Sequence, residues 1–274
     1  MDDIKKKIQD GELIPFLGMG IFKDTKNSDG VQIPYDSDSM ILSLNNGRAM
    51  SPRLMYEYSR AAMSLEQRKG REFIVQMTNH IYSSKEYEIP EVYKWLQTIK
   101  PKYIIDTNMD DSLQKIYSDC EHFLITGVSR ITADWDRYLI YSFDVATKTY
   151  TRIEKEKLTF DLPILFKPMG STKPEMNFII SDADFVDWLT EAMGGYAMPP
   201  IVKEFRKEKE YLFLGVDFGR DTFRMVANEV TVDLKGGYTL FDKSELTKKE
   251  DKFIKTHNLT NLDMSIDEFI KSHG

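Results

Sequence analysis

The chain of 274 residues has an apolar fraction of 41% and an aromatic fraction of 12%, which is the composition of a globular protein able to bury a core unaided. Its 37 Lys and Arg against 44 Asp and Glu give a net charge of −7, which disfavours nonspecific binding to nucleic acid or an anionic membrane while permitting a local basic groove. Cys120 is the only cysteine, so an intramolecular disulfide and a four-cysteine zinc site are excluded. No apolar run approaches a membrane span, and residues 1–11 lack a signal-peptide core, so a cytoplasmic location is expected.

A short helix and a buried strand are predicted at the start of the chain. Residues 2–11 place two isoleucines on one helical face and end in a glycine. Residues 13–17 form a compact apolar run, in which Pro15 indicates a strand that lies near the edge of its sheet or starts late.

The strand leads directly into Gly18-Met19-Gly20. Two glycines after a strand let backbone N–H groups come close to an anion, although this pattern by itself is typical of plain turns. No lysine follows in the Walker order, which disfavours a nucleoside triphosphatase of that kind. The polar, turn-rich residues 23–34 fit either a flexible flap beside this loop or a solvated surface loop.

Residues 51–99 have helical periodicity and predict an inserted layer of helices. Ser64 and Gln67 form a candidate capping box for one of them, and Pro90 suits the first turn of another.

The stretch Tyr103 to Asp111 has the pattern of a ligand site in an α/β protein. Three residues suited to a buried strand are followed by Thr107, Asn108 and Asp110, and then by a helix-compatible segment. The carboxyl end of a buried strand is where open sheets bind their ligands. We therefore expect these polar side chains to lie at the rim of a sheet.

The second half of the chain alternates between strand and helix patterns. The predicted strands are residues 123–128, 138–145, 150–153, 162–166, 178–181, 211–216, 230–234 and 238–241. The predicted helices are one capped by Ser181, one over residues 199–209, one containing Phe223, and two over residues 244–257 and 265–272.

Four predicted strand ends carry glycine or polar clusters, which a parallel sheet would bring to one edge. These clusters are Gly18 with Gly20; Thr107 with Asn108 and Asp110; Gly215 with Asp217 and Asp221; and the segment 166–171. Glycines suit a pyrophosphate, while carboxylates and amides suit ribose hydroxyls and a carboxamide. The sequence therefore predicts a dinucleotide site, with ordinary βα turns as the plainer alternative.

The order of these motifs resembles the sirtuin-like family, and within it the bacterial branch of NAD-consuming defence effectors. The segments that carry the resemblance are IPFLGMGIF, DTNMD at residues 106–110, and YLFLGVDFGRD followed by TFR. The resemblance implies one domain over residues 1–274. Its fold would be α/β, a Rossmann-like parallel sheet with a helical insertion at about 51–100 and a β-rich insertion at about 122–160 in place of a zinc module.

The resemblance also implies roles for particular residues. Gly18 and Gly20 would face the NAD pyrophosphate, and Gly215 and Asp217 would lie near the adenosine half. Asn108 and Asp110 would border the nicotinamide ribose as catalytic residues, with Asn108 holding or activating a water. Met19, Thr107, Met169 and Gly170 complete the residues expected around NAD, and no metal is expected.

Two departures from the family pattern bear on activity. Met169 stands where the family's catalytic histidine should fall, and the zinc-binding cysteine pairs of the protein-deacylating members are missing. Loss of a general base slows a hydrolase by about two to four orders of magnitude without necessarily abolishing it. Deacylation needs that histidine in the family mechanism, so a zinc-dependent deacylase is the least favoured activity.

Two functions of different classes remain open. The first is an NAD+ glycohydrolase effector of anti-phage defence, triggered by a sensor or activator protein within a homo- or hetero-oligomer; Asp110 or a partner chain would supply the missing base. The second is a nucleotide-binding scaffold or regulatory subunit that has lost catalysis. Retention of Asn108 and Asp110 favours the enzyme, and Met169 favours the scaffold.

Overall fold

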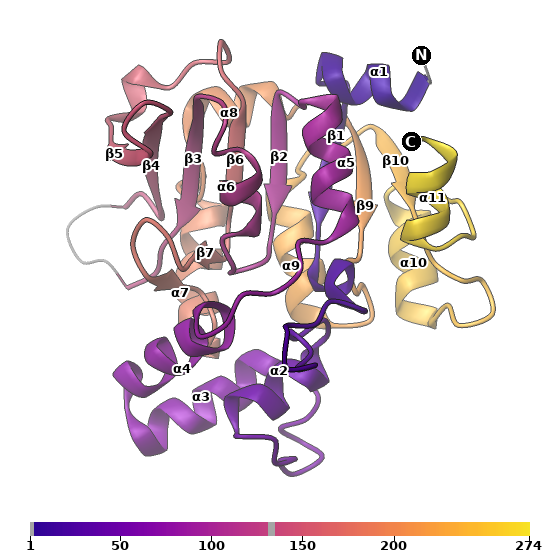
Figure 1. Cartoon of the computed structure of the whole chain (residues 1–274). Helices are drawn as coiled ribbons and strands as arrows, with labels where there is room; N and C mark the ends of the chain where they lie inside the picture. The colour runs from indigo at the N-terminus through magenta and orange to yellow at the C-terminus, as the bar shows by residue number, and fades with distance from the viewer. Residues whose placement is uncertain (1–2, 131–134) are drawn as a thin grey trace.

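A nine-stranded sheet forms the centre of the protein (Figure 1). The computed structural model describes residues 3–130 and 135–274. Within these residues the strand order is β11-β10-β9-β1-β2-β6-β3-β4-β5, and only the β3–β4 and β4–β5 pairs are antiparallel. The strands are β1 (Leu13–Leu17), β2 (Tyr103–Asp106), β3 (His122–Gly127), β4 (Tyr138–Asp144), β5 (Thr149–Arg152), β6 (Ile164–Lys167), β9 (Glu210–Leu214), β10 (Gly236–Thr239) and β11 (Leu259–Asn261). The predicted α/β, Rossmann-like parallel sheet is confirmed.

The central strands are apolar because helices cover both faces of the sheet. Every residue of β1, β2 and β6 is buried. Figure 1 shows α5 (Glu91–Ile99) and α6 (Ser112–Ile116) in front of the sheet, with α8 (Pro200–Phe205) and α9 (Asp221–Val230) behind it.

Of the two alternatives for Pro15, the edge position is wrong, because β1 lies between β9 and β2, whereas a late start applies to the pairing with β2. β1 pairs with β9 from Leu13 onward but with β2 only from Phe16. Successive residues of β1 direct their backbone hydrogen-bonding groups alternately toward β9 and toward β2. Leu17 faces β2, where its carbonyl accepts from the Thr107 amide. Pro15 therefore faces β2 before that ladder begins, so its missing N–H breaks no ladder bond.

Most helices between β1 and β2 gather beyond the carboxyl edge of the sheet. α2 (Ser37–Leu44), α3 (Tyr58–Lys69) and α4 (Arg71–Ser83) lie below the strands in Figure 1. This is the helical layer that the sequence predicted at 51–99, although it starts earlier than predicted.

Two helix starts differ from the sequence expectation. Asp36 begins α2 with a capping box in which its carboxylate accepts from the Ser39 amide at 2.7 Å, a signal the prediction missed. The capping box predicted at Ser64 and Gln67 is wrong, because both residues lie inside α3 and α4 starts after Gly70.

The β-rich segment predicted at about 122–160 joins the main sheet. β3 pairs with β6 in parallel, and β4 and β5 extend that side as an antiparallel hairpin. A tight turn joins the strands predicted at 138–145 and 150–153, and in it the Asp144 carboxylate accepts from the Ala146 amide at 2.7 Å. A separate two-stranded ribbon, β7 (Gly170–Ser171) with β8 (Asn177–Phe178), follows β6.

The carboxyl-terminal part contains one confirmed cap and one wrong strand. Ser181 caps α7 (Asp182–Met193) as predicted. The strand predicted at 230–234 is wrong, because Val230 ends α9 and the Thr231 hydroxyl donates to the Ala227 carbonyl. The remaining elements are α1 (Asp3–Asp10), η1 (Met19–Phe22), η2 (Lys155–Lys157), α10 (Lys248–Thr256) and α11 (Ile266–Ser272).

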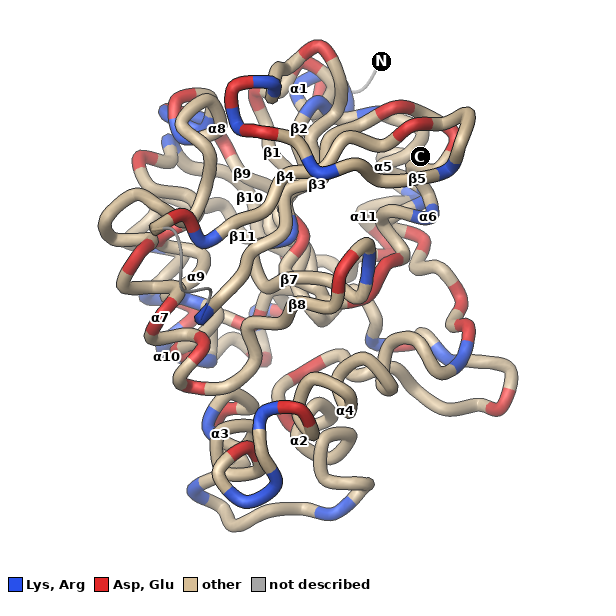
Figure 2. Tube along the Cα trace, turned by 90° about the vertical axis from the view of Figure 1, so that its left-hand side faces the viewer, with Lys and Arg blue, Asp and Glu red and all other residues tan. Residues whose placement is uncertain are grey.

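Charged residues of both signs are spread along the chain. Figure 2 shows Lys and Arg interspersed with Asp and Glu along the trace in this view. Along the described part of the chain, no helix is both long enough and apolar enough to cross a bilayer.

A substitution of Gly127, the last residue of β3, tests how closely β3 packs against the residue that follows β6. A Cβ there would lie 1.8 Å from the Pro168 carbonyl oxygen, a backbone atom that cannot move aside. Gly127→Ala should therefore lower the free energy of unfolding by about 1–3 kcal/mol or more, measured by urea denaturation. The control is Gly194→Ala, where the new methyl meets the ring of the exposed Tyr196 and stability should hardly change. Equal stabilities of the two variants would contradict the packing described.

Candidate functional site

The four predicted strand ends meet at one edge of the sheet. β9, β1, β2 and β6 are consecutive neighbours and all parallel, so their carboxyl ends lie side by side. Each of these strands is followed by one of the clusters that the sequence singled out.

The glycines after β1 and β9 let two backbone segments cross. The Gly18 amide donates to the Leu214 carbonyl at 2.9 Å, and the Gly20 amide donates to the Gly215 carbonyl at 2.8 Å. A Cβ on Gly18 would lie 2.5 Å from the Gly215 carbonyl oxygen, and Gly215 itself has a φ of +68°. Glycine is therefore required here for backbone packing. The amides of Gly18 and Gly20 already have carbonyl partners, so the expected role of these N–H groups toward a pyrophosphate is not seen in this conformation.

Two hollows are lined in part by the residues of this crossing. A cavity of about 190 Å³ is lined by Gly18, Met19, Gly20, Gly215 and Asp217, all predicted site residues, together with other side chains that include Asp36, Phe223 and Glu250. A groove of about 1270 Å³ shares Gly20, Gly215, Leu240 and Phe241 with the cavity and continues between α5 and α11. Together they offer the space that a dinucleotide needs.

The cavity is acidic. Burial raises the pKa of the Asp217 carboxyl, and the neighbouring Glu250 adds to the rise. The Gly219 amide, which donates to Asp217 at 2.8 Å, and Arg220 oppose it. Carboxylates at such a strand end hold ribose hydroxyls in dinucleotide-binding folds, so this lining suits a ribose better than a phosphate.

The residues after β2 form a closed second half of the site. Thr107, Asn108 and Asp110 are at most 5% exposed, and none of them is among the described residues that line the cavity or the groove. The Asn108 side-chain nitrogen lies 3.3 Å from the Gly18 carbonyl oxygen, which places the two halves in contact. The structure therefore brings the predicted residues to one place but leaves Asn108 and Asp110 covered.

Beneath Asn108 lies a charged network that sequence reasoning missed. The Lys167 ammonium is 2.6 Å from the Asp106 carboxylate, and neither side chain is exposed. They are cross-strand neighbours, because Ile105 of β2 faces Phe166 of β6 and each strand then adds one residue. Charged residues ending two apolar strands were the signal that could have revealed this pair.

Tyr93 of α5, a helix that covers one face of the sheet, is the third member of the Lys167–Asp106 network. Its hydroxyl donates to the Asp106 carboxylate at 3.1 Å. Burial, and then the carboxylates of Asp106 and Asp110, raise the pKa of Tyr93 well above its ordinary value, so the phenol stays protonated and can donate.

Asp110 is a second buried carboxyl. One of its oxygens accepts from the Ser112 amide at 2.9 Å, and the other has no partner among the described residues. Burial raises the pKa of Asp110, Asp106 adds to the rise, and Lys167 opposes it. The neutral form of this carboxyl is therefore favoured more than that of an exposed aspartate.

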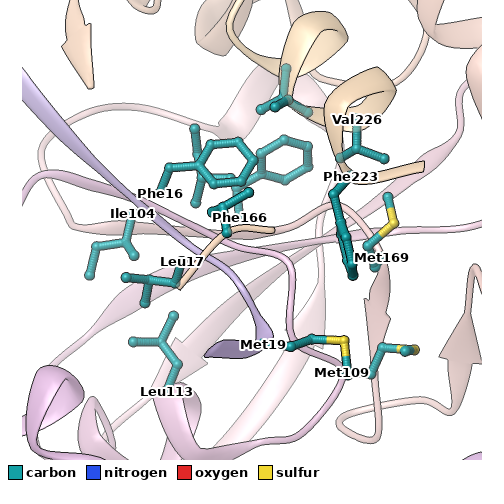
Figure 3. Packing of buried hydrophobic residues seen from close by; sticks show 14 of the residues in the cluster. Phe16, Leu17, Met19, Ile104, Met109, Leu113, Phe166, Met169, Phe223 and Val226 are labelled. Atoms are coloured by element: carbon teal, nitrogen blue, oxygen red, sulfur yellow. The ribbon is translucent and has the colours of Figure 1, made fainter. Parts of the chain in front are cut away.

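Met169 and Gly170 lie beside this closed half. Met169 is 2% exposed and belongs, with Met19 and Met109, to the buried cluster drawn in Figure 3. Gly170 has a φ of +86° and pairs with Phe178 in the β7–β8 ribbon. The Thr172 amide donates to the Met109 carbonyl at 3.0 Å and ties this ribbon to the segment after β2. The apolar thioether of Met169 therefore occupies the position where the family pattern has a catalytic base, and the Gly170 backbone beside it is held in the β7–β8 ribbon.

Residues 3–130 and 135–274 contain no group of three His, Cys, Asp or Glu side chains arranged to hold a metal ion.

Parallel strand ends that meet around glycines and buried polar groups define a Rossmann-like nucleotide-binding class of protein. The family model described as SIR2-like domain matches residues 102–262, more than half of the chain, so the protein belongs to the SIR2-like family. A search of curated proteins found no match. SIR2-like domains bind NAD, and the matched range contains β2, β6 and β9 of the site.

The pKa of Asp217 makes stability depend on pH. Since the folded-state pKa is raised, the carboxyl favours folding most below its unfolded pKa, and this contribution is lost as pH rises through the folded pKa. Asp217→Asn keeps the acceptor for Gly219 and removes the ionisation. The variant should therefore gain stability relative to the parent as pH rises from about 4 to about 7.5. Urea unfolding at both pH values measures this, and an unchanged difference would contradict a raised pKa.

Proposed function

We propose that this SIR2-like protein is an NAD+ glycohydrolase, cleaving NAD+ to nicotinamide and ADP-ribose. The observation that supports it is the pair of buried oxygens Asn108 Oδ1 and Asp110 Oδ1, each without a partner among the described residues. Both residues follow β2, and the Asn108 side-chain nitrogen contacts the Gly18 carbonyl of the glycine crossing that borders the cavity and the groove. Buried acceptors without partners are costly, and a ligand that supplies donors would remove that cost.

The reaction requires little covalent chemistry from the protein. The bond between the nicotinamide nitrogen and the ribose breaks with its electron pair going to nicotinamide, and positive charge develops on the ribose. A water oxygen then bonds to that carbon and releases one proton. Asn108 would hold the water, and Asp110, ionised once the site opens to solvent and its burial is relieved, would stabilise the positive charge and accept the proton.

Binding would use both halves of the site. The adenosine ribose would lie by Asp217 and Gly215, the pyrophosphate would pass the Gly18–Gly20 crossing, and the nicotinamide ribose would reach Asn108. Because Asn108 and Asp110 are covered, the site must open before NAD+ enters. A closed site fits an effector that acts when a partner protein triggers it, as in the anti-phage defence role suggested by the resemblance.

The scaffold function remains as a second candidate, and Met169 is the observation that favours it. A buried thioether supplies neither a proton acceptor nor a donor of useful strength at the position expected for the histidine. Such a subunit would bind NAD+ or a related nucleotide and pass that signal to a partner.

Asn108→Ala tests the enzyme function. The full chain, alone and with candidate partners, should release nicotinamide and ADP-ribose from NAD+, and Asn108→Ala should lower kcat by about two orders of magnitude or more. The matched control is Asn228→Ala, an exposed asparagine of α9 whose loss should leave kcat unchanged. Chromatography of the products gives the rates. Binding of NAD+ without turnover under every condition would support the scaffold instead.

Met169→His restores the residue that the family pattern expects. If the pocket is otherwise competent, the new imidazole should raise kcat by about 10²–10⁴-fold, with a rate that increases as pH rises through about 6.5. Nicotinamide release measured from pH 5.5 to 8 shows both effects. A folded Met169→His variant that remains as slow as the parent at every pH would show that the missing base is not what limits turnover.

A further inference from the structure

The buried pair Lys167–Asp106 lies directly under Asn108, and its geometry points to a function beyond stability. The Asp106 carboxylate receives four hydrogen bonds. Oδ2 accepts from the Lys167 ammonium at 2.6 Å and from the Tyr93 hydroxyl at 3.1 Å. Oδ1 accepts from the Asn108 backbone amide at 3.0 Å and from its side-chain nitrogen at 2.8 Å. Both oxygens are therefore fully engaged by three residues.

These bonds fix which way the Asn108 amide faces. The two closest partners of its side chain are the Asp106 carboxylate and the Gly18 carbonyl, at 2.8 and 3.3 Å. Both are acceptors, so only the amide nitrogen can face them. The side-chain oxygen must then point the other way, and it is the atom that has no partner among the described residues.

The orientation depends on the charge of the pair. A carboxylate accepts hydrogen bonds only, whereas a neutral amide or a protonated acid in its place could also donate and would tolerate a flipped Asn108. Lys167 is the cation that balances this carboxylate in a place without solvent exposure. A charge-assisted hydrogen bond is roughly twice as strong as a neutral one, which makes the arrangement selective for one amide orientation.

We propose that Lys167 and Asp106 are positioning residues that orient Asn108, so that its side-chain oxygen is presented to the nicotinamide-ribose end of the dinucleotide. This inference rests on the proposed NAD+ glycohydrolase function for its ligand, whereas the orientation itself rests on the network alone. Lys167 and Asp106 touch no reacting atom; they act through Asn108.

The test is the double variant Lys167→Met/Asp106→Asn, which removes both charges together and leaves no unpaired buried ion. Steady-state NAD+ cleavage should show kcat lowered about tenfold or more, with KM changed less than about threefold, because the Asn108 amide is no longer held in one orientation. The matched control is Lys7→Met/Glu210→Gln, which removes a 3.0 Å ion pair at the opposite edge of the sheet and should leave both constants unchanged. A folded double variant with the parent kcat would overturn the proposal.

A second measurement needs neither the variant nor turnover. In protein labelled with nitrogen-15 at asparagine, the side-chain amide protons of Asn108, assigned by their loss in Asn108→Ala, should exchange with solvent far more slowly than those of the exposed Asn228. Exchange as fast as at Asn228 would overturn the proposal even if the double variant fails to fold. If the parent protein neither binds nor cleaves NAD+, the proposed function fails, and the exchange rates alone then decide whether Asn108 is held.

Discussion

The ion pair between Lys167 and Asp106 is the interaction on which the rest of the site depends. Both side chains are fully buried, and the pair joins the ends of β2 and β6 at the point where the chain leaves the sheet. Removing one partner of such a pair costs about 3–5 kcal/mol, because the other charge stays buried and uncompensated. Burying the two charges also costs free energy of desolvation, so stability alone does not explain a pair at the carboxyl edge of the sheet. The proposed positioning of Asn108 does explain it.

The glycine crossing plays a complementary part on the other side of β1. Gly18, Gly20 and Gly215 allow η1 to lie across the end of β9, where any side chain would meet backbone. The crossing lines both the small acidic cavity and the long groove, and it also carries the Gly18 carbonyl that contacts Asn108. A ligand that spans both halves must therefore pass this crossing. The Asn108–Gly18 contact joins the two halves of the site.

The sequence predicted the sheet well because its central strands are short apolar runs that end in glycine or polar clusters. β1, β2 and β9 were found close to their observed bounds, and the parallel arrangement then follows from the helices between them. The two wrong predictions have identifiable physical causes. Pro15 is tolerated in a central strand because its ladder with β2 starts one residue later. The segment 230–234 is rich in β-branched residues, but Val230 ends a helix and residues 231–233 form a turn. Tertiary context decided both cases.

The site was predictable as a set of residues but not as a geometry. Strand ends and motif order brought out Asn108, Asp110 and Gly215, and the SIR2-like match over residues 102–262 supports the family. The sequence could not show that the Gly18 and Gly20 amides bond to carbonyls, or that Lys167 faces Asp106, because both depend on strand register. The covering of Asn108 likewise depends on how the β7–β8 ribbon packs against the segment after β2.

The central claim is that one dinucleotide occupies both halves of this edge. A crystal structure of the full chain with a carbocyclic NAD+ analogue, which cannot be cleaved, tests it most directly. We expect the adenosine half to lie beside Gly215 and Asp217, the pyrophosphate to cross Gly18–Gly20, and the nicotinamide ribose to contact Asn108. Clear density for the analogue at another surface, with Asn108 still covered and away from the ligand, would contradict it.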